Sequence, residues 1–504
     1  MRRMLSTLAV IAVLAPPAVA QHDALAGFDA YVAKAVKDWR VPGLAIAVAR
    51  DGEVTFSRGY GVRELGKPGA VDTHTLFAIG STTKAMTAAL VGMLVDEGKV
   101  DWDAPVTNYL PWFQLKDPAV TREVTVRDLL THRAGLGNAD YLWYGQRNST
   151  EEILRRVRLI EPAYSMRAGF IYQNIMYAAA GAVVEAASGK PWATMMQTRI
   201  FDPLGMRDTI PTAAGLSSRP NVASPHFIVD GKVRVIENAS VDPVAAAGAV
   251  WSSVDDMSKW MRFLLDGGKS AGADGKRLLS EAVFSELFTP QTIAPYEMYP
   301  TTRLTRPHWM TYGLGWFQQD YRGRAVDFHT GSIDGMVAIH GLIRDERLGV
   351  YVLANLDHAE ARHALMYSVF DRYTPHGAGP ERDWSADFLK LYGDIQSEET
   401  EARAKKEASR VAGTSPSLSS AQFAGEYSEP LHGDVNVTDD GGKLHLQYGS
   451  AFEGTLEHWH YNTFRATWKA AWRQPQLVTF VLDEDGKPVA VELMGARFTR
   501  KPKS

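Results

Sequence analysis

A serine and a lysine three residues apart, Ser81 and Lys84, have a spacing that could do chemistry. They open the segment Ser81–Leu94, which we predict to be a buried helix because it is apolar on most faces. Residues three apart on a helix face the same side, so the hydroxyl and the amine would be neighbours. An amine with a depressed pKa can take the hydroxyl proton and make the serine a nucleophile. The alternative is a helix-capping serine beside a solvent-facing lysine.

A tyrosine and an asparagine two residues apart, Tyr172 and Asn174, form a second candidate pair where the predicted helix Asn174–Ala187 begins. From a loop before a helix, both side chains can point into one cleft. A phenolate stabilised by ammonium groups can act as a general base, and an amide offers a donor and an acceptor to a substrate amide. The alternative is a capping asparagine beside an aromatic core residue.

A third candidate, His329-Thr330-Gly331-Ser332, follows the predicted strand Val326–Phe328. A glycine on an exposed edge strand lets another backbone approach closely. Such an edge can also bind a peptide-like substrate through main-chain hydrogen bonds. The alternative is a turn at the end of a strand with a solvent-facing histidine.

Two further groups of residues near these motifs have less specific patterns. Tyr141, Trp143 and Tyr144 could line an aromatic substrate pocket, or they could simply pack within a loop. For His132 we expect a structural hydrogen-bonding role.

The elements that must position these residues indicate an α/β (α+β) fold. Predicted strands stand near both ends of the first 373 residues, and a long, mainly helical stretch lies between them. We therefore predict an antiparallel sheet completed by both chain ends, flanked by helices, with an inserted helical lobe. The strands are expected at Leu44–Val48, Val54–Phe56, Gly315–Gln318, Val326–Phe328, Val337–Ile343 and Val350–Leu353, and further helices at Thr125–Leu130, Val254–Leu265 and Ala359–Tyr373.

The chain divides into four predicted parts. Residues 1–20 have a charged start, an apolar run and a small-residue cleavage site after Ala20, which is typical of a signal peptide and of a periplasmic or secreted protein. Residues 21–373 form the first domain, and 374–420 form a linker with a charged helix. Residues 421–504 show short strands at regular spacing, which predicts an all-β barrel. That barrel could also mediate assembly of several copies of the chain.

The composition excludes several classes of function. The 54 basic and 58 acidic residues nearly balance, and no basic run suggests nucleic-acid binding. No apolar run after the signal peptide is long enough to span a membrane. The chain has no cysteine, which rules out disulfides, a thiol nucleophile and a thiolate zinc site.

Taken in order, the three motifs resemble the S-x-x-K, Y-x-N and K/H-x-G motifs of the class C β-lactamase-like serine hydrolases. That family includes penicillin-binding DD-peptidases, D-aminopeptidases and esterases, and the resemblance covers about Phe28 to Tyr373. The C-terminal strands are similar in pattern and position to the lipocalin-like domain appended to some peptidases of the family.

The resemblance implies a role for each motif. Ser81 would attack a carbonyl and form an acyl-enzyme, while Lys84 and Tyr172 would share the base and acid roles. Asn174 would hold the substrate amide, and the backbone N–H groups of Ser81 and Ser332 would form an oxyanion hole. His329, Thr330 and Gly331 would complete the substrate-binding strand. No metal or cofactor is implied.

His329 stands where lactamases and carboxypeptidases of the family usually have lysine, which helps to hold a substrate carboxylate. Imidazole is mostly neutral at pH 7 and is a weaker anion anchor. We therefore predict a peptidase for small or non-standard peptides, such as those with D-residues or linearised non-ribosomal peptides of the microcystin type. An esterase, a β-lactamase and a non-catalytic peptide-binding protein remain as alternatives.

Overall fold

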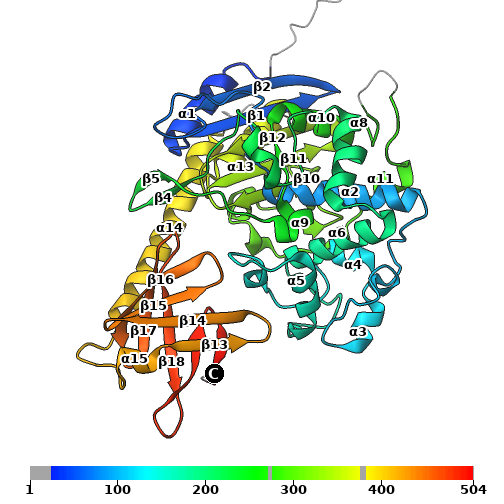
Figure 1. Cartoon of the computed structure of the whole chain (residues 1–504). Coiled ribbons are helices and arrows are strands. Elements are labelled where there is room, and N and C mark those ends of the chain that lie inside the picture. The colour runs from blue at the N-terminus through cyan, green and yellow to red at the C-terminus, as the bar shows by residue number, and fades with distance from the viewer. Residues whose placement is uncertain (1–23, 271–274, 375–381, 503–504) are drawn as a thin grey trace, which may run out of the picture.

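The computed structural model describes residues 24–270, 275–374 and 382–502. The predicted signal peptide, residues 1–20, lies outside these ranges. Figure 1 shows a large α/β body joined by one long helix to a smaller β-structure that contains the C-terminus. Across the described ranges, no helix is both long enough and apolar enough to cross a membrane.

An eight-stranded sheet forms the centre of the large body and confirms the predicted antiparallel sheet. Its order is β2-β1-β12-β11-β10-β9-β8-β7, so the N-terminal hairpin joins strands from the end of the domain, as expected. The strands are β1 (Gly43–Arg50), β2 (Glu53–Gly61), β7 (Thr292–Ile293), β8 (Met310–Tyr312), β9 (Phe317–Tyr321), β10 (Arg324–Ile333), β11 (Met336–Ile343) and β12 (Leu348–Ala354).

Both faces of this sheet are buried, which is why its central strands are almost wholly apolar. In β1, Leu44, Ile46 and Val48 pack on one face and the intervening alanines on the other. Because side chains alternate along a strand, a continuous apolar run fits a sheet that is covered on both sides.

The helices cover the sheet and build the inserted lobe. α13 packs on one face and α10 on the other, while α2 runs between the sheet and the lobe (Figure 1). Ser253 caps α10 by accepting the Asp256 N–H. The helices of the body are α1 (Phe28–Asp38), α2 (Thr83–Asp96), α3 (Pro118–Glu123), α4 (Val126–Leu130), α5 (Thr150–Arg156), α6 (Asn174–Ser188), α7 (Trp192–Met196), α8 (Asp202–Leu204), α9 (Ala245–Gly248), α10 (Val254–Leu265), α11 (Glu281–Leu287), α12 (Thr302–Thr305) and α13 (Ala361–Tyr373). Two short pairs of strands complete it: β3 (Phe77–Ala78) with β6 (Trp251–Ser252), and β4 (His226–Val229) with β5 (Lys232–Val235).

The C-terminal strands form a closed eight-stranded barrel, as predicted. Pairing of β13 with β20 closes it, and inward apolar side chains such as Val435 and Val437 alternate with outward polar ones. The strands are β13 (Gly425–Glu429), β14 (Gly433–Asp440), β15 (Lys443–Tyr448), β16 (Phe452–His460), β17 (Thr463–Trp468), β18 (Gln476–Leu482), β19 (Pro488–Leu493) and β20 (Ala496–Arg500), preceded by the short helix α15 (Ser420–Phe423).

The long helix α14 (Trp384–Ala408) connects the body to the barrel. Its first turns are not a free linker, because Trp384 and Phe388 are buried against Tyr367 of α13. At its far end, Arg410 donates from Nε to the Trp459 carbonyl of the barrel at 2.6 Å. The connection is therefore packed onto both of the parts that it joins.

Candidate active site

Ser81 lies in a single 3₁₀ turn, Gly80–Thr82, and α2 begins only at Thr83. The sequence predicted a helix from Ser81 itself, so the predicted start is two residues early. The turn is held because Gly80 has a φ of +53°, a conformation that favours glycine. Ser81 is partly exposed beside a helix that is otherwise buried.

Strand β10 passes very close to this turn at Gly331. A Cβ added at Gly331 would lie 1.9 Å from the Ile79 carbonyl oxygen and 3.1 Å from the Ser81 backbone nitrogen. A Cβ added at Gly80 would lie 2.7 Å from the Ser332 nitrogen. Two glycines facing each other therefore bring the backbones that carry the Ser81 and Ser332 N–H groups together.

β10 differs from the expected edge strand, because it is central in the sheet. However, β9 pairs only with its first half, Arg324–Phe328. Residues His329–Ile333 pair with β11 on one side alone, so the other side of this half is a local edge. The predicted exposed main chain therefore exists, but only where the strand passes the Ser81 turn.

Lys84 is fully buried, and its amine lies at the centre of the site. Nζ lies 2.8 Å from Asn174 Oδ1, 2.9 Å from the Ala247 carbonyl oxygen and 3.0 Å from Ser81 Oγ. Burial lowers the pKa of Lys84 well below its usual range, which the Asp140 carboxylate partly counteracts. A neutral amine has two N–H bonds and one lone pair. The Asn174 and Ala247 oxygens can only accept, so they take the two N–H bonds, and the lone pair is left facing Ser81 Oγ.

Asp140 is a member of the site that no sequence motif indicated. Both of its oxygens accept from Asn174 Nδ2, each at 3.3 Å, and Oδ1 accepts from Trp143 Nε1 at 2.7 Å. These bonds orient the Asn174 amide so that its oxygen faces Lys84. No spacing in the sequence links Asp140 to the other motifs, because the contact exists only in the folded chain.

Tyr172 lies against Lys84, with its ring centre 4.7 Å from Nζ. Burial raises the pKa of Tyr172 well above its usual value, and the nearby Ser81 hydroxyl only partly offsets this. The ring packs on His132, with 4.3 Å between ring centres, and His132 Nδ1 accepts the Gln173 N–H. The environment thus favours a protonated Tyr172. His132 holds the ring in place, which agrees with the structural role expected for this histidine.

His329 is 1 % exposed, and both of its ring nitrogens are engaged. Nδ1 donates to the Thr330 carbonyl at 2.6 Å, which leaves Nε2 to accept from the Tyr312 hydroxyl at 3.1 Å. Burial, reinforced by the charge of Lys84, lowers the pKa of His329 to about 3. The expected direct contact with substrate is not supported by this geometry, in which His329 positions β10 and Tyr312.

The buried side chain of Arg362 holds Gly331 and Ser332, which follow His329 and Thr330 in the third motif. Arg362 Nη1 donates to the Gly331 carbonyl at 2.6 Å and to Ser332 Oγ at 3.0 Å, and its charge is paired with Glu360. The Thr330 hydroxyl bonds to Tyr299 at 2.9 Å. Ser332 itself remains exposed. These bonds hold the local edge of β10 in register with the Ser81 turn.

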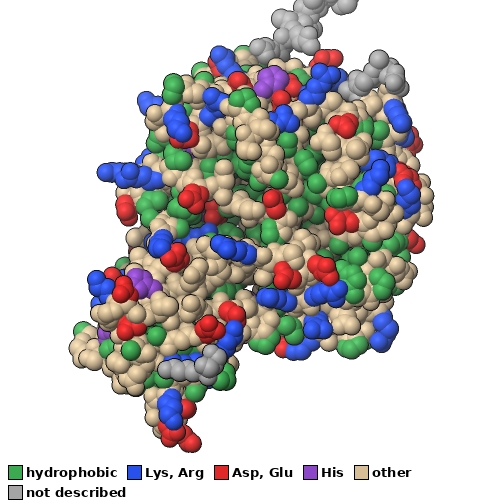
Figure 2. All heavy atoms as spheres, viewed as in Figure 1, with side chains coloured by type: hydrophobic (Ala, Val, Ile, Leu, Met, Phe, Trp, Pro, Cys, Tyr) green, Lys and Arg blue, Asp and Glu red, His purple; other side chains and the backbone are tan. Residues whose placement is uncertain are grey.

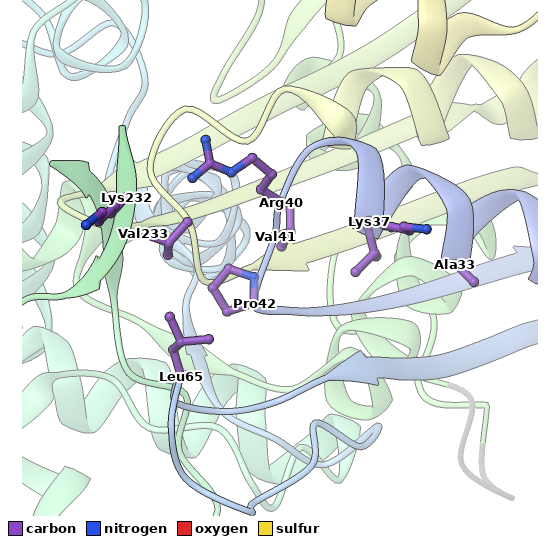
Figure 3. Close-up of a pocket in the computed structure, with 9 residues that line it drawn as sticks. Ala33, Lys37, Arg40, Val41, Pro42, Leu65, Lys232 and Val233 are labelled. Atoms are coloured by element: carbon purple, nitrogen blue, oxygen red, sulfur yellow. The ribbon is translucent and has the colours of Figure 1, made fainter. Parts of the chain in front are cut away.

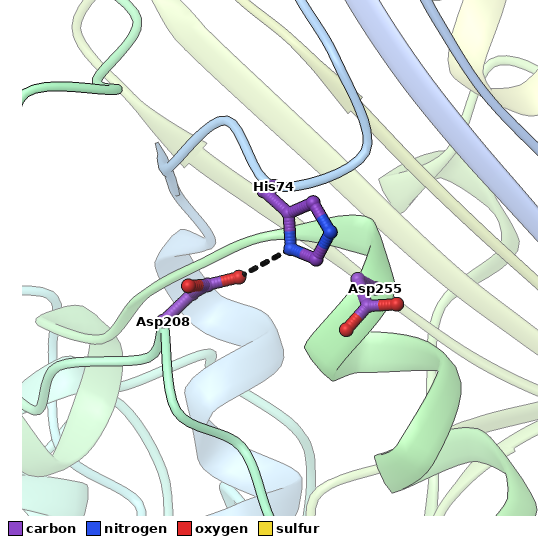
Figure 4. A group of neighbouring side chains, drawn as sticks. All are labelled: His74, Asp208 and Asp255. Carbon is purple, nitrogen blue, oxygen red and sulfur yellow. Dashed lines mark hydrogen bonds and ion pairs between the residues drawn. The ribbon is translucent and has the colours of Figure 1, made fainter.

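Two other features of the surface lie away from this site. A cavity of about 490 Å³ lies between α1 and the β4–β5 hairpin, bordered by Arg40, Leu65 and Lys232 (Figure 3). His74, Asp208 and Asp255 lie within 4.8 Å of one another in a metal-like group (Figure 4). However, Nζ of Lys259 lies 3.0 Å from Asp255, and His74 bonds to Asp208 at 2.8 Å, so ion pairs account for this group.

Acidic and basic side chains mix on the face of the molecule that Figure 2 shows. They are interspersed there over both the body and the barrel. This distribution agrees with the near-neutral composition.

The fold and the Ser81–Lys84 pair together define a serine hydrolase with a β-lactamase-like body. Residues 28–370 match the family model described as Beta-lactamase, and the chain belongs to that family. Residues 409–503 match a second model, described as Domain of unknown function (DUF3471).

Named relatives include hydrolases and penicillin-binding proteins. The chain is 30% identical to the unguisins hydrolase ungD of Aspergillus violaceofuscus, over 92% of this chain and 87% of the relative. It is 29% identical to penicillin-binding protein 4 of Amycolatopsis lactamdurans (58% of this chain, 76% of the relative) and 35% identical to esterase EstB of Burkholderia gladioli (36% and 50%). The octameric penicillin-binding protein homologue from Pyrococcus abyssi shares the fold, with a TM-score of 0.62 and 21% identity over 94% of this chain and 99% of that one.

Proposed function

We propose that this protein is an exported serine peptidase that cleaves amide bonds in small or non-standard peptides through an acyl-enzyme. The observation that carries the proposal is the Lys84 amine, buried and placed 3.0 Å from Ser81 Oγ with its two N–H bonds directed elsewhere. A base of this kind activates a serine without a histidine or a metal. Peptides with D-residues or linearised non-ribosomal peptides, such as the microcystin type, are the favoured substrates.

The proposed reaction proceeds in two halves. Ser81 Oγ attacks the carbonyl carbon while its proton passes to Lys84 Nζ, and the negative charge develops on an oxygen facing the Ser81 and Ser332 N–H groups. As the C–N bond breaks, the leaving nitrogen takes a proton from Lys84 or through the Tyr172 hydroxyl. Water then attacks the acyl-enzyme ester, releases the carboxylic acid and restores Ser81.

Two observations favour a peptide over other acyl substrates. The local edge of β10 at His329–Ile333 offers unpaired main-chain groups beside Ser81, which suits an extended peptide. In addition, a relative that matches 92% of this chain is named as a hydrolase of unguisins. The neutral, enclosed His329 supplies no cation for a substrate carboxylate, which disfavours a β-lactamase.

An esterase is the second candidate, because a relative named esterase EstB is 35% identical over 36% of this chain. Ester and amide hydrolysis use the same nucleophile and base, and an ester needs less help for its leaving group. A non-catalytic peptide-binding protein is the third candidate, and the intact Ser81, Lys84, Tyr172 and Asn174 disfavour it.

The test is covalent labelling of Ser81 by a fluorophosphonate, read by mass spectrometry. Wild type should gain one adduct on the peptide that contains Ser81, and a folded Ser81→Ala variant should gain none. Identical spectra for the two proteins would exclude Ser81 as the nucleophile. Turnover of D- and L-aminoacyl anilides, short peptides, p-nitrophenyl esters and nitrocefin then ranks the substrates, and nitrocefin turnover above all peptides would reverse our order.

Export, domain organisation and assembly belong to the same proposal. We expect N-terminal sequencing of the mature protein to begin after Ala20, in the periplasm or the medium. We also propose domains at 21–373 and 421–504, joined by 374–420, with the barrel resembling a lipocalin-like domain. The barrel is the proposed surface for self-assembly, which light scattering of the protein with and without residues 421–504 would test.

A further inference from the structure

A cavity of about 380 Å³ lies between the C-terminal barrel and the rim of the candidate active site. Tyr144 and Ser332 of the body line one side, while Phe452 and Trp472 of the barrel line the other. Because Ser332 is the proposed second donor of the oxyanion hole, the cavity begins beside the position of the reacting carbonyl. The barrel therefore contributes side chains to a cavity that reaches Ser332, the residue of β10 that lies against the turn carrying Ser81.

The two sides of this cavity are held together by specific contacts. The Tyr144 hydroxyl donates to both oxygens of Asp334, at 2.8 and 2.9 Å, and Arg473 of the barrel lies 3.4 Å from the same carboxylate. The Arg473 guanidinium also lies near the rings of both Tyr144 and Phe452, at 4.8 and 4.7 Å from their centres. This arrangement forms a wall that exists before substrate binds.

The barrel segment that carries the wall is also fixed internally. Trp468 Nε1 donates to the Gln474 carbonyl at 3.0 Å, which closes the loop between β17 and β18 around Trp472. On the facing side, the Ser450 N–H donates to the Gly145 carbonyl at 2.7 Å. The barrel is therefore tied both within this loop and to the segment that carries Asp140 and Tyr144.

The chemistry of the lining favours an uncharged group. The charge of Arg473 is paired with Asp334, and Asp357 is paired with His358. Aromatic faces supply most of the remaining wall, and such rings bind apolar and aromatic groups well. Trp472 Nε1 and Arg473 Nε, both buried, have no hydrogen-bond partner among the described residues.

We propose that this cavity is a substrate subsite for a bulky, uncharged, aromatic or aliphatic side chain that flanks the scissile bond. Trp472 of the barrel is its specificity-determining residue. The inference rests on the proposed function in taking Ser81 as the nucleophile, and it deepens that function by naming the side chain that is recognised. It also gives the barrel a role in substrate choice within a single chain.

The test compares Trp472→Ala with Tyr461→Ala, a control aromatic residue on the barrel that is 58% exposed and does not line the cavity. Each protein is first titrated with a fluorophosphonate, so that only molecules with a reactive Ser81 are counted. Rates are then measured for an ester pair, p-nitrophenyl acetate and p-nitrophenyl 3-phenylpropionate. They are also measured for the dipeptide amide Ala-Ala and for its two variants with phenylalanine in the first or in the second position, each compared with Ala-Ala. Trp472→Phe is included as a smaller change that keeps an aromatic ring.

Wild type should prefer the bulky member of at least one pair, and Trp472→Ala should lose about tenfold or more of that preference in kcat/KM. Trp472→Phe should lose less, and Tyr461→Ala should keep the wild-type ratio. An unchanged ratio in fully labelled Trp472→Ala, for every pair, would overturn the proposal. So would a wild type that shows no preference for bulk.

The same data separate this inference from the peptidase proposal. If no amide is cleaved but the ester ratio changes in Trp472→Ala, the subsite stands and the peptidase assignment fails. If amides are cleaved and the ratios of the amide pairs and of the ester pair are all the same in both proteins, the peptidase assignment stands and the subsite fails.

Discussion

Nζ of Lys84 and Oδ1 of Asn174 lie 2.8 Å apart, and this bond joins the first two sequence motifs. The asparagine oxygen can only accept, as can the Ala247 carbonyl at 2.9 Å, so the two fix how the amine is turned. The amine's lone pair then faces Ser81 Oγ. This orientation and the backbone around it determine how the site should respond to substitution and to pH.

Lys84 should control the acidic limb of the pH profile. Because burial lowers its pKa and the neutral amine is the base, kcat/KM should be lost as the pH falls through that depressed pKa. Lys84→Arg should lose about 10²–10⁴-fold at pH values above that pKa, since a guanidinium stays protonated. Lys99→Arg, at an exposed site, is the matched control. Wild-type activity in Lys84→Arg would assign the base elsewhere.

Asp140→Asn should move the same limb to lower pH. The Asp140 carboxylate raises the pKa of Lys84, so replacing it with a neutral amide should lower that pKa further. The replacement side chain keeps an oxygen that can accept from Trp143 Nε1, which limits rearrangement of the loop. Profiles of kcat/KM against pH for the two proteins measure the shift. A limb displaced toward higher pH would contradict the electrostatic role given to Asp140.

Gly331→Ala should slow acylation of Ser81. The added Cβ would meet the Ile79 carbonyl at 1.9 Å, so β10 must move away from the turn and take the Ser332 N–H with it. Loss of one oxyanion donor costs about 10²–10³-fold in kcat, and overpacking costs about 1–3 kcal/mol of stability.

The control for Gly331→Ala is Gly393→Ala in α14, where nothing lies within 4 Å of the added Cβ. This change should leave fluorophosphonate labelling unchanged, because an alanine suits the interior of a helix. Equal labelling rates in the two variants would show that the contact between β10 and the Ser81 turn does not matter for acylation.

His340→Phe should make the protein less sensitive to acid. Burial lowers the pKa of His340 from 6.5 to about 3, so between these values the unfolded chain binds a proton that the folded chain does not. As the pH decreases across that window, the free energy of unfolding should therefore also decrease, by about 1.4 kcal/mol per pH unit for this residue. The ring packs on Trp316 and Tyr351, which phenylalanine can also contact.

The measurement is the thermal midpoint of both proteins from pH 8 to pH 4. Above pH 6.5 the two midpoints should differ by a constant amount, and below it the wild-type midpoint should fall more steeply. Parallel curves down to pH 4 would show that protonation of His340 does not oppose folding.

The sequence predicted the parts of the site that depend on local spacing. Ser81 and Lys84 meet because they are one turn apart, and the apolar runs of β1, β11 and β12 define the sheet in which the third motif lies. The contributions of Asp140 and the Ala247 carbonyl were not predicted, because both residues lie far from Lys84 along the chain and no helix or strand repeat relates them to it. Their proximity is a result of tertiary packing.

Burial was the second property that the sequence could not reveal. The pattern around His329 was consistent with either a cleft residue or a solvent-facing one, and the structure instead encloses it among Tyr172, Tyr312 and Phe317. Likewise, the aromatic residues around Tyr144 were consistent with either a pocket or loop packing. Only the position of the barrel shows that they line a cavity, since contacts between two separate cores leave no periodic pattern in either.

The three groups around the Lys84 amine come from segments that are far apart in the chain, namely Ser81, Asn174 and Ala247. Until those segments meet and water leaves, a lysine at this position stays protonated and its serine is an ordinary alcohol. A nascent or half-folded chain should therefore be chemically inert toward the cell's own peptides. Hydrolytic competence would appear only once these segments have packed together, which makes a covalent serine probe a direct reporter of native molecules.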